Sequence, residues 1–256
     1  MTGTGLLELK EVSSSYYSGE TLLPVLDNVS LKVGEGEFVS LLGPSGSGKS
    51  TVLKIAAGLL EPDRGRVIYR GRDVTGEPRR VGYMPQQDML FPWKTLAQNA
   101  ALPLLCAGSG KRDAAARVEE MLPLFGLEGF GDYYPYQLSG GMRQRSALMR
   151  TMLIESNLWL LDEPFAALDA LTRENLQGWL LRIWERFKGA VLFVTHSIDE
   201  AIYLSDRVYM ISNRPGRIIL EEVINLPRPR PRQVITTAQF AGYKETLLRT
   251  LAGEGY

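Results

Sequence analysis

Short apolar runs and segments of helical periodicity follow one another along most of the chain. Near the start, residues 6–12, 25–33 and 38–42 are β-rich and bounded by turn residues, which predicts three strands. Residues 157–162 and 190–195 are apolar without an alternating polar position. Such runs are typical of strands buried on both faces, as in a parallel sheet covered by helices. The pattern therefore predicts an α/β fold.

The intervening segments predict helices. Residues 49–60 follow a glycine-rich turn and contain few β-branched residues, and a second helical segment spans about 170–187. Residues from about 88 to 155 carry helical patterns broken by Pro and Gly. We therefore expect a helical subdomain between the early and late strands.

Turn residues organise the C-terminal part of the chain. Two β-rich stretches flank the sequence NRPG at residues 213–216, which predicts a hairpin. The sequence LPRPRPRQ at residues 226–233 favours an extended, polyproline-like and solvated linker before a short helical tail. We expect one folded unit over residues 1–225, and the Pro/Arg-rich linker and tail over residues 226–256.

Composition narrows the functional class. The 256 residues include 29 Lys plus Arg and 29 Asp plus Glu, so net charge gives no reason to expect nucleic acid as a partner. No apolar run approaches the roughly 18 residues of a membrane span. The N-terminal residues Met1–Gly5 lack the basic and apolar regions of a signal peptide, and Cys106 is the single cysteine. These features predict a cytosolic protein.

The sequence GPSGSGKS matches G-x-x-x-x-G-K-[ST] and lies between a predicted strand and a predicted helix. Its glycines permit backbone angles and close approaches that allow N–H groups to surround phosphate oxygens. Lys49 supplies a positive charge to the β and γ phosphates, and the hydroxyl of Ser50 is a suitable Mg²⁺ ligand. The loop predicts a nucleoside triphosphate site. Its candidate residues are Gly43, Pro44, Ser45, Gly46, Ser47, Gly48, Lys49, Ser50 and Thr51.

A P-loop also needs a carboxylate at the end of a neighbouring buried strand to support the metal. Asp162 follows four apolar residues and would hold Mg²⁺, directly or through water. Glu163 comes next, where it could polarise a water as a general base. Adjacent acids at a strand end are often simply solvated, but the P-loop favours the catalytic interpretation. An acid at the second position favours hydrolysis over phosphoryl transfer and argues against a P-loop kinase.

Two features remain ambiguous on the residues alone. Ser139-Gly140-Gly141 opens a predicted helix, where it could hold an anion or simply cap the helix. His196 is the only histidine and follows an apolar run. It is either a core side chain or a group placed to touch a ligand.

The motifs GPSGSGKST, LSGGMRQR, LLDEP, AALD and VTHSIDEA occur in the order and approximate spacing of the ATP-binding subunits of ABC transporters. The resemblance covers residues 6–222 and implies their P-loop NTPase fold: a mostly parallel core sheet, an N-terminal antiparallel β subdomain and an inserted α-helical subdomain. It also implies that two ATPase subunits, identical or homologous, pack head to tail around ATP and Mg²⁺. Ser139, Gly140 and Gly141 of one subunit would bind the γ-phosphate held by the other.

The resemblance assigns roles to two positions where neighbours are alternatives. Tyr16 matches the aromatic residue that stacks on adenine, and Tyr17 is a neighbouring possibility. Gln86 matches the glutamine that senses Mg²⁺ and the attacking water, with Gln87 as the weaker candidate. These residues would complete the nucleotide site around the P-loop.

Two further roles follow from the resemblance. Asp169 matches the residue that links the two sites across the dimer, and His196 matches the histidine that contacts the γ-phosphate and positions the catalytic carboxylate and water. The chain departs from the family pattern at Met142, where many members have Gln, and at Ala166, where many have Ser. Neither departure removes a phosphate, metal or water ligand.

At subgroup level, MLFPWKT and SDRVYMISNRPGRI look most like the nitrate, sulfonate and taurine importers. The implied function is ATP hydrolysis that powers solute import through ATP-driven dimer closure. The implied partners are transmembrane permease subunits and, indirectly, a solute-binding protein, which would place the chain peripherally on the cytoplasmic face of the cell membrane.

We expect Leu90, Phe91 and Trp93 to form an apolar surface for a cytoplasmic permease helix, unless Trp93 is ordinary core. A soluble ABC-type ATPase acting on nucleic acid or ribosomes is the alternative function. The single cassette and the balanced charge argue against it.

Overall fold

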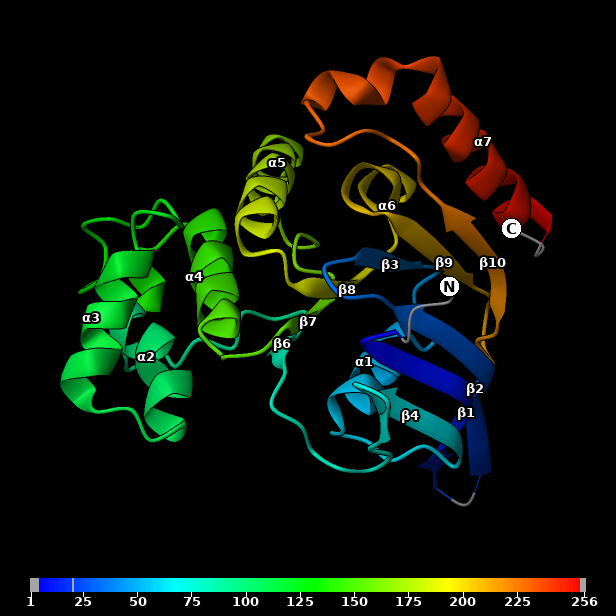
Figure 1. Cartoon of the computed structure of the whole chain (residues 1–256), viewed down its shortest axis with the longest axis horizontal. Helices are drawn as coiled ribbons and strands as arrows, with labels where there is room; N and C mark the ends of the chain where they lie inside the picture. The colour runs from blue at the N-terminus through cyan, green and yellow to red at the C-terminus, as the bar shows by residue number, and fades with distance from the viewer. Residues whose placement is uncertain (1–4, 20, 254–256) are drawn as a thin grey trace.

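The protein is described by a computed structural model that covers residues 5–19 and 21–253 (Figure 1). Most of the segment assessed for signal-peptide features, residues 1–4, lies outside the described residues. The strands are β1 (Leu7–Ser18), β2 (Thr21–Val33), β3 (Phe38–Leu42), β4 (Arg64–Tyr69), β5 (Arg72–Asp73), β6 (Gly82–Met84), β7 (Leu158–Asp162), β8 (Ala190–Thr195), β9 (Arg207–Ile211) and β10 (Ile218–Val223). The helices are α1 (Lys49–Ala57), α2 (Leu96–Cys106), α3 (Lys111–Met121), α4 (Gly140–Met152), α5 (Ala170–Phe187), α6 (Ile198–Leu204) and α7 (Ala238–Gly253), with 3₁₀ turns at Pro135–Gln137 and Arg232–Thr236.

The core sheet has the strand order β10-β9-β3-β8-β7-β6, and the pairs from β9 to β6 are parallel. Every residue of β3, β7 and β8 is buried, as the apolar runs predict. In β3, Phe38 and Leu42 belong to the hydrophobic core that includes α5 and α6, whereas Val39 and Leu41 belong to the core that includes α1. The sheet therefore carries a hydrophobic core on each face, and the prediction of a mostly parallel, helix-covered sheet is confirmed.

A second, antiparallel sheet with the order β2-β1-β4-β5 lies against α1 (Figure 1). The antiparallel N-terminal sheet is as predicted, although β4 and β5 were not expected from the apolar pattern. The helix predicted over residues 49–60 ends at Ala57, because Gly58 adopts a φ of 72°. A Cβ on Gly58 would lie 2.0 Å from the carbonyl oxygen of Glu77, so only glycine fits this helix end.

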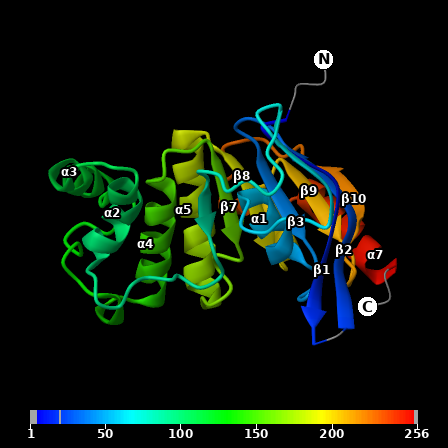
Figure 2. The ribbon, with the colours of Figure 1, turned by 90° about the horizontal axis from the view of Figure 1, so that it is seen from below.

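The helices α2, α3 and α4 lie together on one side of the molecule, far from the antiparallel sheet (Figures 1 and 2). They fill most of the region 88–155 for which a helical subdomain is predicted, between β6 and β7. The boundaries of that subdomain, and the division at residue 225, stay predictions. Within the described residues, no helix is both long enough and apolar enough to cross a membrane.

The predicted hairpin around residues 213–216 is confirmed, since β9 and β10 pair in antiparallel fashion. Its turn also docks on β2: the N–H of Gly216 donates to Val25, and the carbonyl of Gly216 accepts from Asp27. The turn is therefore fixed beside the start of the P-loop helix rather than projecting freely.

The prediction of a solvated linker at residues 226–233 is wrong for its arginines. The side chain of Arg228 lies 4.2 Å over the ring of Trp184. Arg230 is only 5% exposed, and its guanidinium donates hydrogen bonds to backbone carbonyls at the end of α6 and beyond β10. These acceptors belong to Ile202, Tyr203, Ser205, Ile224 and Leu226. Because a helix end leaves carbonyls without partners, the rigid fork of an arginine can satisfy several at once and draw the segment inward.

Replacing Arg230 by Met should lower the free energy of unfolding by about 3 kcal/mol, because buried carbonyls then lose their donors. Burial lowers the pKa of Arg230 to about 10, so the guanidinium is still charged at neutral pH. Urea denaturation of the full chain measures the change. The matched control is Arg249→Ala, which removes an exposed pair with Glu245 and should leave the unfolding midpoint unchanged. Equal midpoints for both variants would contradict the structural role of Arg230.

Candidate functional site

The predicted site residues follow the carboxyl ends of adjacent parallel strands. The P-loop follows β3, Glu163 follows β7, His196 follows β8, and Gln86 lies two residues beyond β6. The strands β3, β8, β7 and β6 are consecutive neighbours in the sheet. Ligands of open α/β sheets bind outside the carboxyl ends of the strands. The topology thus brings together four segments that are far apart in the sequence.

Two P-loop glycines are required by geometry. A Cβ on Gly43 would lie 2.5 Å from the side chain of Ile211. Gly48 has a φ of 98°, and its Cβ would lie 2.6 Å from Leu26. The hydroxyl of Ser47 is buried and finds no hydrogen-bond partner among the residues that the structure describes. The close packing at Gly43 and Gly48 fixes the path of the loop backbone, whose N–H groups can surround a phosphate.

Lys49 is the buried cation of the loop. Its Nζ donates to the carbonyls of Gly43 (2.9 Å) and Pro44 (2.7 Å) and lies 3.6 Å from Oε1 of Glu163. Burial lowers the pKa of Lys49, and the negative charge of Glu163 opposes that shift. A triphosphate would supply further negative charge and favour the ammonium form.

Glu163 and His196 are in direct contact. The Nδ1 of His196 lies 3.1 Å from Oε2 of Glu163, and the carboxylate can only accept, so Nδ1 carries the shared proton. The side chain of His196 is 52% exposed, so the alternative of a core histidine is wrong. Glu163 has a φ of 43°, rare for a residue with a side chain, and its N–H is held by the carbonyl of Val194. Backbone strain of this kind is concentrated at functional sites.

Asp162 is 4% exposed, and burial raises its pKa, while a hydrogen bond from Ser50 opposes the shift. The two residues present a hydroxyl and a carboxylate side by side at the P-loop. Mg²⁺ prefers such oxygen ligands and is usually held by one or two of them together with substrate phosphates. The residues predicted to hold the metal therefore fit it, with Gln86 close by in the same cleft.

Lys49, Ser50 and Glu163 line a cleft of about 360 Å³, whereas Asp162 and His196 are not among its lining residues. Tyr16 lines it, and its hydroxyl lies 3.4 Å from Oγ1 of Thr51, whereas Tyr17 is 80% exposed and lies outside the lining. Gln86 lines it, and Gln87 does not. The P-loop residues that line the cleft are Ser45, Gly46, Gly48, Lys49, Ser50 and Thr51, whereas Gly43, Pro44 and Ser47 are not among its lining residues. The structure thus favours Tyr16 over Tyr17 and Gln86 over Gln87 as residues of the cleft.

Sequence reasoning missed Arg214 as a site residue. It belongs to the turn between β9 and β10, lines the cleft, and its Nε lies 3.4 Å from the carbonyl oxygen of Gly46. The sequence NRPG indicated a turn, but no local signal shows that this turn reaches the P-loop from residues 168 positions away. Only the docking of the turn on β2 reveals it.

The second glycine cluster and Asp169 lie outside the cleft of their own chain. Ser139 caps α4 by accepting from the N–H of Met142, and Asp169 caps α5 by accepting from Thr172. Gly140 lines a separate hollow, which also contains Gln86. Gly141, the second helical residue of α4, is likewise not among the residues that line the P-loop cleft. Capping and a role toward a second subunit are compatible, because Ser139 and Asp169 are exposed.

The loop after Gln86 carries exposed apolar side chains, but not the set that the sequence predicts. Leu90 is buried, at 8% exposure, so its place on the surface is corrected. Met89, Phe91 and Trp93 are 60%, 40% and 69% exposed, and the rings of Phe91 and Trp93 are 5.3 Å apart. The alternative of Trp93 as ordinary core is therefore wrong. We call Met89, Phe91 and Trp93 the aromatic patch.

The backbone beneath the aromatic patch is fixed by hydrogen bonds from α2 and α4. Asn99 on α2 is fully buried, and its amide bonds both the N–H and the carbonyl of Phe91. Arg150 on α4 donates to the carbonyls of Asp88 and Met89. The side chains are exposed even though the backbone beneath them is fixed.

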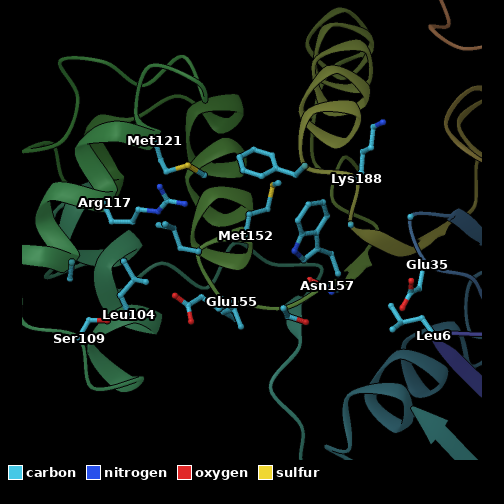
Figure 3. A pocket seen from close by; sticks show the side chains of 18 of the residues that line it. Leu6, Glu35, Leu104, Ser109, Arg117, Met121, Met152, Glu155, Asn157 and Lys188 are labelled. Atoms are coloured by element: carbon cyan, nitrogen blue, oxygen red, sulfur yellow. The ribbon is translucent and has the colours of Figure 1, made fainter. Parts of the chain in front are cut away.

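A larger cavity, of about 730 Å³, lies at the opposite ends of the strands (Figure 3). Asn157 and Gly189, which precede β7 and β8, line it, together with Arg117 and Met121 on α3. It contains none of the predicted site residues. Size alone therefore does not identify the nucleotide cleft, which is distinguished by its P-loop and by the contact of Lys49 with Glu163.

Comparisons with known proteins agree with these features. A family model described as ABC transporter matches residues 26–166. An aliphatic sulfonates import ATP-binding protein of Bacillus cereus is 43% identical over 92% of this chain and 92% of its own. A formylaminopyrimidine import ATP-binding protein of Halalkalibacterium halodurans is 39% identical over 96% of this chain and 94% of its own. A solved ATP-binding cassette, a dimer in a post-hydrolysis state with ADP and Pi, aligns with a TM-score of 0.76 and 33% identity, over 86% of this chain and all of that one.

The adjacent tyrosines allow a matched test of the cleft. Tyr16→Ala should raise the Kd for ATP roughly tenfold or more, because stacking of a base on an aromatic ring contributes about 1–3 kcal/mol. Tyr17→Ala should leave the Kd unchanged, since that side chain lies outside the cleft. Equilibrium binding of a fluorescent ATP analogue, competed with ATP, measures both. Equal losses for the two variants would remove Tyr16 from the site.

Proposed function

Because this chain belongs to the ABC transporter family and is an ATPase, we propose that it powers solute import of the nitrate, sulfonate and taurine type. The observation that carries the proposal is the contact of Lys49, Glu163 and His196 at one edge of the sheet. A phosphate-binding cation, a general base and the group that orients that base thus form a contiguous series, beside the cleft that Lys49 and Glu163 line.

The proposed chemistry follows from these contacts. Glu163 takes a proton from a water aligned with the γ-phosphate, and Gln86 helps to orient that water. His196 fixes the carboxylate of Glu163 through Nδ1, and donation from its other ring nitrogen to a phosphoryl oxygen requires a second proton, on Nε2. Lys49 binds oxygens of the β and γ phosphates through its ammonium group. Ser50 and Asp162 would hold Mg²⁺, which would neutralise part of the charge of those phosphates.

We propose that the functional unit is a dimer, with either an identical chain or a homologous subunit. Ser139, Gly140 and Gly141 then reach the γ-phosphate bound by the other subunit, and Asp169 links the two sites. Support comes from the exposure of Ser139 and Asp169, and from the dimeric state of the similar solved cassette. Closure is favoured because nucleotide makes its full set of contacts only in the closed pair.

We propose that the aromatic patch receives a cytoplasmic helix of a transmembrane permease, as a helix docks in an apolar groove. This contact would hold the chain peripherally on the cytoplasmic face of the membrane. A solute-binding protein would act on the permease and only indirectly on this chain. The import names of both relatives support this function over a role on nucleic acid or ribosomes.

Glu163→Gln should reduce the rate of ATP hydrolysis roughly 100- to 10,000-fold, because the amide cannot accept the proton of the attacking water. Nucleotide binding should persist, and ATP should trap a dimer that gel filtration detects. Glu155→Gln is the matched control, since Glu155 lines the cavity at the other ends of the strands. Normal turnover by the Glu163 variant would show that another group is the base.

Trp93→Ala should weaken binding to the co-expressed permease by about 2 kcal/mol, or roughly 30-fold, as expected for a central aromatic anchor. The amount of chain that sediments with permease-containing membranes measures the loss. Leu248→Ala removes an exposed apolar residue on α7 and should not change sedimentation. A Trp93 variant that sediments like the native chain would exclude the aromatic patch as the docking surface.

A further inference from the structure

A buried carboxylate that the proposed chemistry does not use lies directly behind His196. Glu200, on α6, is 7% exposed. Its Oε2 accepts from the hydroxyl of Thr195 at 2.5 Å, and its Oε1 accepts from the side-chain amide of Gln177 on α5 at 3.0 Å. Thr195 and Gln177 are themselves buried. A charged group with good partners on both oxygens fixes the elements that supply them.

Through Thr195 this carboxylate fixes the backbone on both sides of His196. Thr195 is the last residue of β8, and its hydroxyl also accepts from the N–H of Ser197 at 3.0 Å. The hydroxyl of Ser197 in turn accepts from the N–H of Glu200. His196 is therefore the exposed residue of a short turn whose other members are bonded to one another.

Glu200 is also linked, through Arg173, to the segment that follows Glu163. The Nε of Arg173 lies 3.9 Å from Oε1 of Glu200 and 3.3 Å from the carbonyl oxygen of Phe165, and its Nη2 donates to Leu168 at 2.9 Å. Phe165 and Leu168 lie between Glu163 and Asp169 in the chain. The carboxylate of Glu200 thus stabilises the turn of His196 through Thr195 and the segment after Glu163 through Arg173.

The same network reaches the C-terminal segment. The Nη1 of Arg232 donates to Oε1 of Gln177 at 2.8 Å, while Nε2 of Gln177 donates to Glu200. Arg232 is held over the ring of Tyr203 at 5.1 Å and pairs with Glu174 at 3.0 Å. An unbroken series of hydrogen bonds therefore runs from Arg232 through Gln177, Glu200 and Thr195 to the turn of His196.

We propose that Glu200 is the positioning residue of the hydrolysis site and that Arg232 connects the C-terminal segment to it through Gln177. The proposal rests on the proposed ATPase chemistry and adds a remote determinant of its rate. Misplacing a catalytic group by about 1 Å can lower a rate roughly 100-fold. Loss of the outer hydrogen bond therefore lowers turnover while the P-loop still binds nucleotide.

The first test uses Arg232, whose side chain is one-third exposed, so its replacement does not open the core. In the tag-free full chain, Arg232→Ala should lower kcat three- to tenfold, with KM and the Kd for ATP within twofold of the native values. Arg232→Lys should restore at least half of the lost kcat. Glu174→Ala removes only the surface ion pair of Arg232 and should leave kcat unchanged.

The single histidine gives a second, direct measurement. The imidazole NMR signals of the native chain report His196 alone. Arg232→Ala and Glu200→Gln should both shift them, and Glu174→Ala should not. Glu200→Gln preserves the shape of the buried side chain, and its folding is checked by urea denaturation.

The outcomes separate this inference from the proposed function. A native chain that hydrolyses ATP, with Arg232 and Glu200 variants that keep its kcat and its imidazole signals, overturns the positioning role alone. Variants that lose stability while kcat per folded molecule is unchanged also overturn the positioning role alone. A native chain without ATPase activity overturns both proposals. Reduced kcat, unchanged ATP affinity and shifted imidazole signals support the positioning role.

Discussion

The candidate site depends on one constraint, the register in which the parallel strands β3, β8 and β7 pair. Leu42 of β3 lies opposite Thr195 of β8, and Val194 lies opposite Asp162 of β7. The next residues along each strand are Gly43, His196 and Glu163. Because the ends of β3 and β8 are level and β7 ends only one residue earlier, the phosphate loop, the histidine and the carboxylate emerge at one edge. A slip of one residue would turn each side chain to the opposite face of the sheet.

Burial on both faces is what fixes that register. The inner strands are covered by α1 on one side and by α5 and α6 on the other, so a slipped strand would exchange apolar contacts for voids on two sides at once. The fixed edge also tolerates local strain. Glu163 keeps a φ of 43° because the carbonyl of Val194 on the adjacent strand holds its N–H. The scaffold thus supplies the free energy that an unusual backbone at the site requires.

The sequence alone could predict those features that depend on neighbouring residues. The P-loop spacing, the buried strands and the acids at the end of β7 are local patterns, and the structure places them together as the sheet topology requires. The roles of Ser139 and Asp169 came from resemblance to a family and stay predictions. Arg214, the buried Leu90 and the inward-facing Arg230 were missed or wrong. Each depends on a contact between distant segments, such as a hairpin turn docked on β2 or an arginine that reaches the end of α6, which no spacing rule encodes.

The rigid mounting of the aromatic patch has a thermodynamic consequence. Only residues 87–92 separate Gln86, in the nucleotide cleft, from Trp93, and Asn99 and Arg150 brace that short stretch. If docking at Trp93 and occupancy of the cleft favour the same position of this stretch, they share one coupling free energy, and coupling between two binding events is reciprocal. If ATP increases the affinity of this chain for a membrane subunit by a given factor, binding of that subunit must increase the affinity for ATP by the same factor. A cassette detached from the membrane would therefore differ in nucleotide affinity from the same cassette in its complex, although every residue of the cleft is its own.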